Sequence, residues 1–110
     1  PRQNPDLKPE VIAPGENIIS TGAGDQWYSS SGTSDSTVFV TGALSLILEA
    51  YPQFKPNPDS NGDCIDLVKN SLMETSLKYQ DTVEHDDRWG YGQLQAFDWY
   101  QDLAVQSASC

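Results

Sequence analysis

The residues with the clearest capacity for chemistry are the serines that lead into one apolar segment, Ser29–Tyr51 (SSSGTSDSTVFVTGALSLILEAY). Gly32 separates a small, polar run from a helical pattern, and Ser34 falls in what would be the first helical turn. Backbone N–H groups at a helix start are unpaired, and the helix dipole is positive there. A serine at this place could be a nucleophile beside an oxyanion-stabilising site. The alternative is that Ser34 or Ser36 only caps the helix.

Two other features carry a weaker signal for catalysis. Gly32, Thr33 and Ser34 do not form a nucleophile elbow, because Ser36 stands where the G-x-S-x-G motif has its second glycine. His85, the only histidine, has acidic neighbours that would favour the imidazolium, which is the wrong form for a general base. We expect His85 to lie at the surface.

Two acidic clusters could hold a hard cation through oxygen ligands. Their members are Asp59, Asn61 and Asp63 in the first, and Asp81, Glu84, Asp86 and Asp87 in the second. The first lacks the spacing of an EF-hand loop, because Gly62 falls before the third ligand position. We interpret it as a solvated turn and a helix cap at Asp63, and the second as an exposed acidic loop.

The elements that must position Ser34 can be placed from periodicity and turn signals. A helix over 34–51 carries no charged residue between Asp35 and Glu49, which predicts burial on nearly every side. Three short strands are predicted before it, at 11–13, 18–19 and 27–28. The last two would pair as a hairpin, since Gly22 and Gly24 supply positive-φ positions.

Two amphipathic helices are predicted after the central one. Apolar residues spaced three and four apart define a helix over 64–77. Its inward residues are Ile65, Val68 and Leu72, with Met73 and Leu77 beside them. A tight aromatic turn at 89–92 leads into a helix over 93–106, with Leu94, Phe97, Tyr100 and Leu103 or Ala104 inward. Two helices and a hairpin scarcely cover a helix that is apolar all round, so we expect the back half of a larger α/β domain.

Composition limits the classes of function. The 110 residues carry 16 acidic and 6 basic side chains, a net charge of -10 and a mean hydropathy of -0.52. This balance argues against nucleic acid and against an anionic membrane surface, and it suits an extracellular or high-salt setting. The longest apolar run is too short to span a bilayer. The chain begins at Pro1 rather than Met and shows no signal peptide, so we expect a processed piece or a fragment.

The two cysteines, Cys64 and Cys110, could close a large loop on each other. Such a bridge would contribute roughly 4 kcal/mol of stability in the chain-entropy model. The alternatives are two unpaired thiols, or a bond from Cys110 to another chain. A C-x-x-C metal or redox pattern is absent from the sequence.

Several motifs, taken together and in order, resemble those of the subtilisin-like serine proteases. Residues 8–18 (KPEVIAPGENI) are similar to that family's K-P-[DE]-[IV]-x-A-P-G-x-x-I segment. Residues 31–34 resemble its nucleophile motif, S-G-T-S-x-A, and residues 40–43 stand in place of V-A-G-A. Residues 71–75 resemble the family's next helix, and 90–92 its turn into the last helix. The likeness covers almost the whole chain.

The resemblance implies a fold, an activity and a set of site residues. The fold is α/β, the three-layer subtilisin-like fold, with residues 1–110 supplying its C-terminal part as a hairpin of short strands and three helices, the first of them buried. The activity is hydrolysis of peptide bonds through an acyl-enzyme, with Ser34 as nucleophile and its backbone N–H as an oxyanion donor. The residues implied for the oxyanion side and the substrate cleft are Thr33, Gly32, Ser31 and Ser30.

The family's catalytic Asp and His and its oxyanion Asn have no matching motif here. The resemblance implies that they lie in the N-terminal part of the same protease domain, as a preceding segment or a separate chain. This chain alone would be inactive, because a serine without its base is not activated at neutral pH. The implied partners are that N-terminal part and a peptide or protein substrate, with no nucleic acid and no membrane. The chemistry needs no cofactor, a structural calcium ion stays open with no site assigned, and the implied location is secreted.

Two departures from the family pattern bear on activity. Val38 and Phe39 stand where the family has Pro and His, and we expect a trans peptide before Val38, since a cis bond there would cost ~3 kcal/mol or more, together with a locally altered first turn. Asp35 stands where Met or Ala is usual. An ionised carboxylate ~6 Å from a developing oxyanion would cost ~3 kcal/mol at an effective dielectric of ~20, on the order of a hundredfold in rate. The alternative function is therefore a catalytically degenerate homologue that serves as a structural or protein-binding module.

Overall fold

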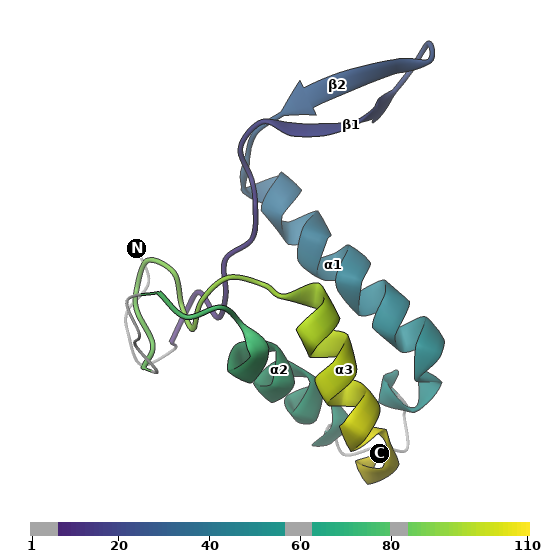
Figure 1. Cartoon of the computed structure of the whole chain (residues 1–110), viewed down its shortest axis with the longest axis vertical. Helices are drawn as coiled ribbons and strands as arrows, with labels where there is room; N and C mark the ends of the chain where they lie inside the picture. The colour runs from purple at the N-terminus through teal and green to yellow at the C-terminus, as the bar shows by residue number, and fades with distance from the viewer. Residues whose placement is uncertain (1–6, 57–62, 80–83) are drawn as a thin grey trace.

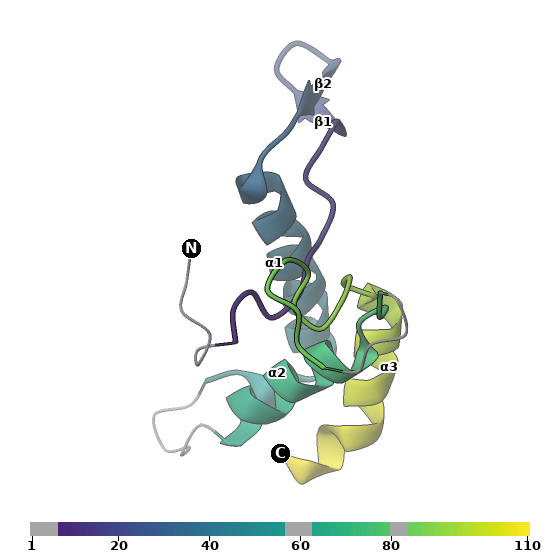
Figure 2. The ribbon, with the colours of Figure 1, turned by 90° about the vertical axis from the view of Figure 1, so that its left-hand side faces the viewer.

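A computed structural model describes residues 7–56, 63–79 and 84–110 of the chain. Its elements in order are β1 (Ile18–Gly22), β2 (Gln26–Ser30), α1 (Thr33–Ala50), α2 (Asp63–Thr75) and α3 (Ala96–Gln106), with 3-10 turns at Pro52–Phe54 and Ser107–Ser109. The hairpin of β1 and β2 lies beyond the N-terminal end of α1, while α2 and α3 pack near its other end (Figure 1). The hairpin and α1 follow one another along the long axis of the molecule (Figure 2).

The hairpin is confirmed in position and is longer than predicted. β1 and β2 are antiparallel, with Ser20 opposite Tyr28. At the turn, Gly24 and Asp25 have positive φ angles of 77 and 56°. The second positive-φ position, which we predicted at Gly22, is therefore at Asp25. Gly22 instead makes room for a ring, because a Cβ there would lie 1.8 Å from Tyr28 Cδ2. The residues of β2 are all exposed.

Helix α1 forms where predicted, and the described residues cover only one of its sides, so the burial on nearly every side that we expect of a larger domain stays a prediction. Among its residues only Ile47 is buried, at 1% exposure, whereas Val38 and Leu46 are 62% and 68% exposed. Among the described residues, α2, α3 and the 3-10 turn after α1 contribute the buried core residues that α1 meets at Ile47. The opposite side of α1 stays uncovered because no other described element lies over it.

A small core joins α2, α3 and the C-terminal half of α1. Its buried apolar residues are Ile47, Phe54, Val68, Leu72, Trp99 and Leu103. The indole Nε1 of Trp99 donates a hydrogen bond to the carbonyl oxygen of Val68 at 3.2 Å, so this large side chain is buried without an unpaired donor. Three residues predicted on the inward side, Ile65, Leu77 and Phe97, are instead 44%, 56% and 68% exposed. On α3 Trp99 takes the inward place that we predicted for Phe97, and Leu77 lies beyond the end of α2.

A disulfide joins Cys64, near the start of α2, to Cys110 at the end of the described chain, with Cα atoms 5.9 Å apart. Of the alternatives left open by the sequence, the intrachain bridge is therefore the one that forms. It closes a loop with a sequence separation of 46. Because α3 lies inside that loop, the bridge ties the start of α2 to the residues that follow α3.

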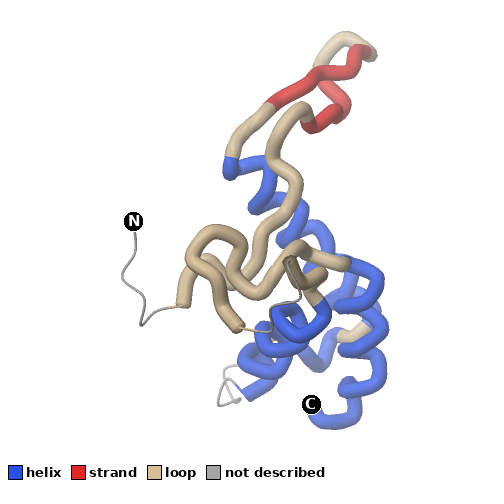
Figure 3. The backbone as a smooth tube through the Cα atoms, turned by 60° about the vertical axis from the view of Figure 1, so that its left-hand side comes forward, coloured by secondary structure: helices blue, strands red, loops and turns tan. Residues whose placement is uncertain are grey.

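Two loop segments, 8–15 and 84–93, lie side by side beside the helices (Figure 3). The amide of Ile12 donates to the Gly92 carbonyl at 2.9 Å, and the amide of Leu94 donates to the Ile12 carbonyl at 2.9 Å. The predicted strand at 11–13 is thus reduced to a single parallel bridge between Ile12 and Gln93. We call the place where the two segments meet the crossing. Gly90 is required there, because a Cβ on it would lie 2.3 Å from the Glu10 carbonyl oxygen.

His85 belongs to this crossing, and its predicted surface position is wrong. Its side chain is only 4% exposed, and its Nε2 lies 2.8 Å from the carbonyl oxygen of Pro9. Its ring packs edge-on against Tyr91 with centroids 5.3 Å apart. The histidine therefore helps to hold the segment that leads toward Gly15.

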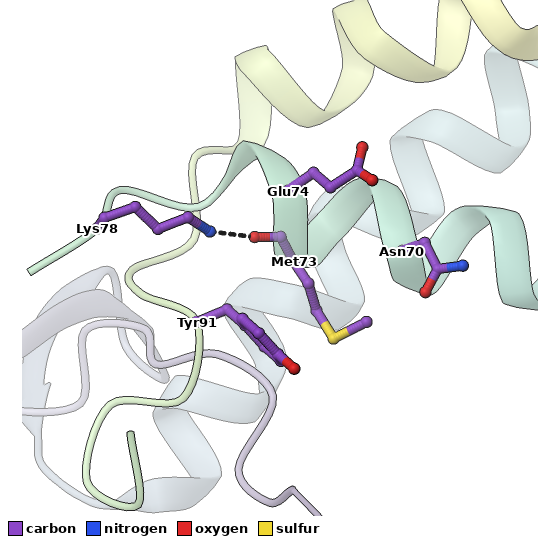
Figure 4. A pocket seen from close by; sticks show the side chains of 5 residues that line it. All are labelled: Asn70, Met73, Glu74, Lys78 and Tyr91. Atoms are coloured by element: carbon purple, nitrogen blue, oxygen red, sulfur yellow. Dashed lines mark hydrogen bonds between the residues drawn. The ribbon is translucent and has the colours of Figure 1, made fainter. Parts of the chain in front are cut away.

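The C-terminal end of α2 is capped by a lysine from the following residues. Lys78 Nζ donates to the carbonyl oxygen of Met73 and, at 2.9 Å, to Ser76 Oγ (Figure 4). Burial lowers the pKa of Lys78, and the nearby Glu74 carboxylate opposes that effect only in part. A hollow of about 370 Å³ next to this cap is lined by Asn70, Met73, Glu74, Lys78 and Tyr91. Because its one cation, Lys78, already bonds to the Met73 carbonyl, we interpret this hollow as part of the cap.

Candidate active site

Ser34 is the second residue of α1 and is exposed. The N-cap residue of α1 is Gly32. The alternative that Ser34 or Ser36 caps the helix is therefore wrong. The Gly32 carbonyl accepts from the amides of Asp35 and Ser36 at 3.1 and 3.4 Å. Within the described residues, the amides of Thr33 and Ser34 have no backbone acceptor. Two N–H groups at the positive end of an 18-residue helix are thus open to an anion.

The loop before Ser34 is held by contacts with the segment that ends at Gly15. The Gly32 amide donates to the Gly15 carbonyl at 2.7 Å. Gly15 also lies so close that a Cβ on it would be 2.3 Å from Ser36 Oγ. The hydroxyl of Ser36 is therefore directed at the supporting segment. Within the described residues Ser34 Oγ has no hydrogen-bond partner.

The two serines that precede Gly32 are held in place by side-chain bonds. Ser31 Oγ accepts a hydrogen bond from the amide of Asn17 at 2.9 Å, which ties the exit of β2 to the entry of β1. Ser30 Oγ donates to Asp35 Oδ1 at 2.8 Å, which ties β2 to the first turn of α1. Hydrogen bonds therefore hold Ser30 and Ser31 on the loop that leads to Ser34 at the start of α1.

The residues predicted for the site are contiguous in the structure, but they do not share one cavity. A hollow of about 530 Å³ lies between the start of α1 and segment 9–13. Its lining includes Thr33 and Ser36 from α1 and Arg88 from the facing loop. Ser30, Ser31, Gly32 and Ser34 are not among the residues that line it. Arg88 was missed by sequence reasoning, because nothing local places a residue of the last loop opposite the first turn of α1.

The first turn of α1 keeps ordinary peptide geometry at the position where the family has proline. In the described residues the one cis bond is Lys8–Pro9, so the bond before Val38 is trans, as predicted. Val38 itself is 62% exposed. The substitution of proline by valine is therefore accommodated within a regular helix.

Metal ligation finds no support in the described residues, where no three His, Cys, Asp or Glu side chains converge. Asp86, from the second acidic cluster, accepts hydrogen bonds from the amides of Arg88 and Trp89 at 2.7 and 3.4 Å. It is thus engaged in a turn. Side chains of the first cluster (59, 61 and 63) and residue 81 of the second lie outside what the structure describes.

Comparisons with known proteins agree on one family. A family model described as the subtilase family matches residues 1–92. The C5a peptidase of Streptococcus pyogenes is 32% identical over 78 residues, which are 71% of this chain and 7% of that protein. Subtilisin-like protease 3 of Plasmodium falciparum is 34% identical over 80 residues, 73% of this chain and 9% of that protein.

Two solved structures share the fold. The CspB protease of Clostridium perfringens superimposes with a TM-score of 0.70 and 26% identity over 89% of this chain and 20% of that one. The patellamide maturation protease PatA gives 0.63 and 25% over 90% of this chain and 35% of that one. The chain therefore belongs to the subtilase family, and the predicted subtilisin-like α/β fold is confirmed. It spans less than a tenth of the length of these two curated relatives.

Proposed function

We propose that this chain supplies the nucleophile and its supporting helix to a subtilisin-like serine endopeptidase. The observation that carries the proposal is the position of Ser34, exposed and unbonded at the start of α1 beside two amides without backbone acceptors. Membership of the subtilase family supports peptidase activity in general. Ser34, Thr33, Gly32, Ser31 and Ser30 keep the roles that the motif implies for them.

In the proposed reaction Ser34 Oγ attacks the carbonyl carbon of a peptide bond. Its proton passes to a histidine base and then to the departing amine, as the C–N bond breaks and the acyl-enzyme forms. Water then hydrolyses the ester and restores the hydroxyl. The backbone N–H of Ser34 donates to the oxyanion in both steps, where a preorganised donor is worth roughly 3–4 kcal/mol.

The base must come from outside this chain. His85 is the only histidine, and its Nε2 lies at the Pro9 carbonyl, inside the crossing of segments 8–15 and 84–93. We therefore propose that the catalytic Asp and His and the oxyanion Asn belong to the N-terminal part of the same domain. The uncovered apolar side of α1 supports this proposal, because a larger domain would bury it.

A second candidate function is a degenerate homologue with a structural or protein-binding role. The observation that favours it is Asp35, whose carboxylate oxygen lies in the same region around Gly32 as the backbone nitrogen of Ser34 and would oppose negative charge there. In that case Ser34 would be a surface serine with no part in chemistry.

A serine-directed phosphonyl fluoride distinguishes the two. The complete protease domain should take up one label at Ser34, detected by mass spectrometry of the peptide that contains it. Ser34→Ala should abolish both labelling and peptide hydrolysis. The matched control is Ser45→Ala, which removes a hydroxyl from the same helix, where it only bonds to the Thr41 carbonyl. No label at Ser34, with processing and activity unchanged in Ser34→Ala, would establish the degenerate homologue.

We also propose a secreted location. The Cys64–Cys110 disulfide supports it, because such bonds persist in oxidising compartments. In the described ranges none of the helices has the length and hydropathy of a membrane-spanning segment. The net charge of -10 is compatible with a high-salt setting, and a stability that does not rise in molar salt would count against that part of the proposal.

A further inference from the structure

Asp35 is the residue after the proposed nucleophile, and its carboxylate is held by a side chain from the residues that precede the nucleophile. Its Oδ1 accepts from Ser30 Oγ at 2.8 Å. Its Oδ2 lies 3.8 Å from the place that a Cβ would take on Gly32, and the backbone N of Ser34 lies 3.9 Å from that same place. The carboxylate oxygen and the backbone nitrogen of the nucleophile therefore lie within the same small region around Gly32.

This carboxylate has no cationic partner in the described part of the chain. The ion pairs there involve Glu10 and Asp87 and none involves Asp35. Asp35 is half-buried, so solvent screens its charge less than at a fully exposed position. A single neutral hydroxyl, that of Ser30, orients it.

Such a charge has two consequences for a substrate bound over Gly32. It repels the negative charge that develops on the carbonyl oxygen, and this repulsion slows the hydrolysis of every peptide by the same factor. It also attracts any positive group that the substrate carries beside the scissile bond, and this attraction offsets the repulsion. Substrates with a cation there are therefore favoured over neutral ones of the same shape.

We propose that Asp35 determines specificity, selecting peptides that carry a lysine or arginine side chain at a residue flanking the scissile bond. The inference rests on the proposed function, since it needs Ser34 to be acylated. The net charge of -10 acts in the same direction, because a long-range negative field draws cationic peptides toward the chain.

A purely structural role for Asp35 is the competing explanation. An acidic residue in the first turn of a helix stabilises it through the helix dipole, and Asp35 occupies that place in α1. That role affects unfolding but has no reason to distinguish one peptide from another. The ratio of kcat/KM between two peptides that differ only in charge therefore separates the two roles.

The experiment uses the complete protease domain and paired peptides with lysine or norleucine on either side of the cleaved bond. The wild type should cleave the better-placed lysine peptide about 2- to 5-fold faster than its norleucine pair, as one charge pair near the surface predicts. Asp35→Asn keeps an acceptor for Ser30 and should bring the ratio near 1, while neutral peptides are cleaved faster. Ser30→Ala keeps the charge but frees the carboxylate, and should give an intermediate ratio.

The matched control is Glu49→Gln, which removes the same charge at the other end of α1, about 20 Å away. It should leave the ratio at the wild-type value. Phosphonyl fluoride labelling of Ser34 is measured in every variant. Labelled Ser34 with a ratio near 1 in the wild type, or a ratio that persists in Asp35→Asn, overturns the role of Asp35 and leaves the proposed function intact. No label in the wild type overturns the proposed function, and the specificity inference falls with it.

Discussion

Gly15 and Gly32 are hydrogen-bonded to each other across the whole hairpin, with the Gly32 amide 2.7 Å from the Gly15 carbonyl oxygen. This bond ties the loop that carries Ser34 to segment 8–15, which is itself anchored by its hydrogen bonds to segment 84–93. The site is therefore only as rigid as the path from Gly15 back to the crossing with loop 84–93.

Gly15→Ala adds only one methyl group, but it should destabilise the fold and disturb the loop that carries Ser34. The new methyl group would lie 2.3 Å from Ser36 Oγ and 2.8 Å from the Gly32 carbonyl oxygen, and the backbone atom cannot move aside. We expect a loss of ~1–3 kcal/mol in the free energy of unfolding, measured in urea, and slower phosphonyl fluoride labelling of Ser34. Gly42→Ala is the control, because no described atom lies within 4 Å of a Cβ there. Equal effects of the two variants would contradict the importance of the Gly15 contact.

Leu46 and Ile47 are neighbours in α1 with opposite exposure, 68% and 1%. In this chain alone, Ile47→Ala should cost ~2–5 kcal/mol of unfolding free energy, and Leu46→Ala less than ~0.5 kcal/mol. In the complete domain Leu46→Ala should become costly as well, by ~2 kcal/mol or more, because the N-terminal part would cover it. Denaturant unfolding of both variants in both contexts measures the change. A Leu46→Ala variant that stays neutral in the complete domain would refute the expected burial of that side of α1.

Glu10 links segment 8–15 to α2 through Lys69, whose Nζ is 3.2 Å from Glu10 Oε2, and it also pairs with Lys8 of its own segment. Burial raises the pKa of Glu10, but the hydrogen bonds and charges of the two lysines outweigh it and leave the pKa below its ordinary 4.5. A depressed pKa stabilises the fold above the unfolded value, and that stabilisation is lost as the pH falls through the folded value. The free energy of unfolding should thus decline below about pH 4.5 more steeply in the wild type than in Glu10→Gln. Parallel pH profiles would contradict this.

Reduction of the Cys64–Cys110 bond should destabilise the chain by ~4 kcal/mol, because its loss frees a loop with a sequence separation of 46 in the unfolded state. Urea unfolding with and without a reducing agent measures the difference. The Cys64→Ala/Cys110→Ala double variant should match the reduced wild type and ignore the reducing agent. A reductant effect that persists in the double variant would show that the agent acts elsewhere.

The elements were predictable from local pattern, and the contacts between them were not. Spacing of apolar residues located all three helices to within a few residues, and Gly24 located the hairpin turn. The covering of α1 depends on which other elements are present, so its composition alone predicts burial without showing which elements supply it. The same holds for His85, whose partner Pro9 lies 76 positions away in the chain.

At the candidate site, the roles of Ser30, Ser31, Gly32, Thr33 and Ser34 come from the motif and stay predictions, because these residues are consecutive in the sequence and lie together in any fold. The bond between Ser30 and Asp35 could not be foreseen, because it depends on the angle between β2 and α1. Arg88 likewise reaches the hollow next to Thr33 only through the crossing of two distant loops.

The disulfide also sets what happens when the backbone is cut. A single cleavage between Cys64 and Cys110 opens the chain but releases nothing, because both fragments stay tied through sulfur. A cleavage in the hairpin, whose second strand is fully exposed, separates the N-terminal segment with no covalent tether to the remainder. If the complete enzyme digests itself, the part of the chain that bears α2 and α3 should outlast the part that bears the hairpin. On a non-reducing gel the surviving part should run as one species.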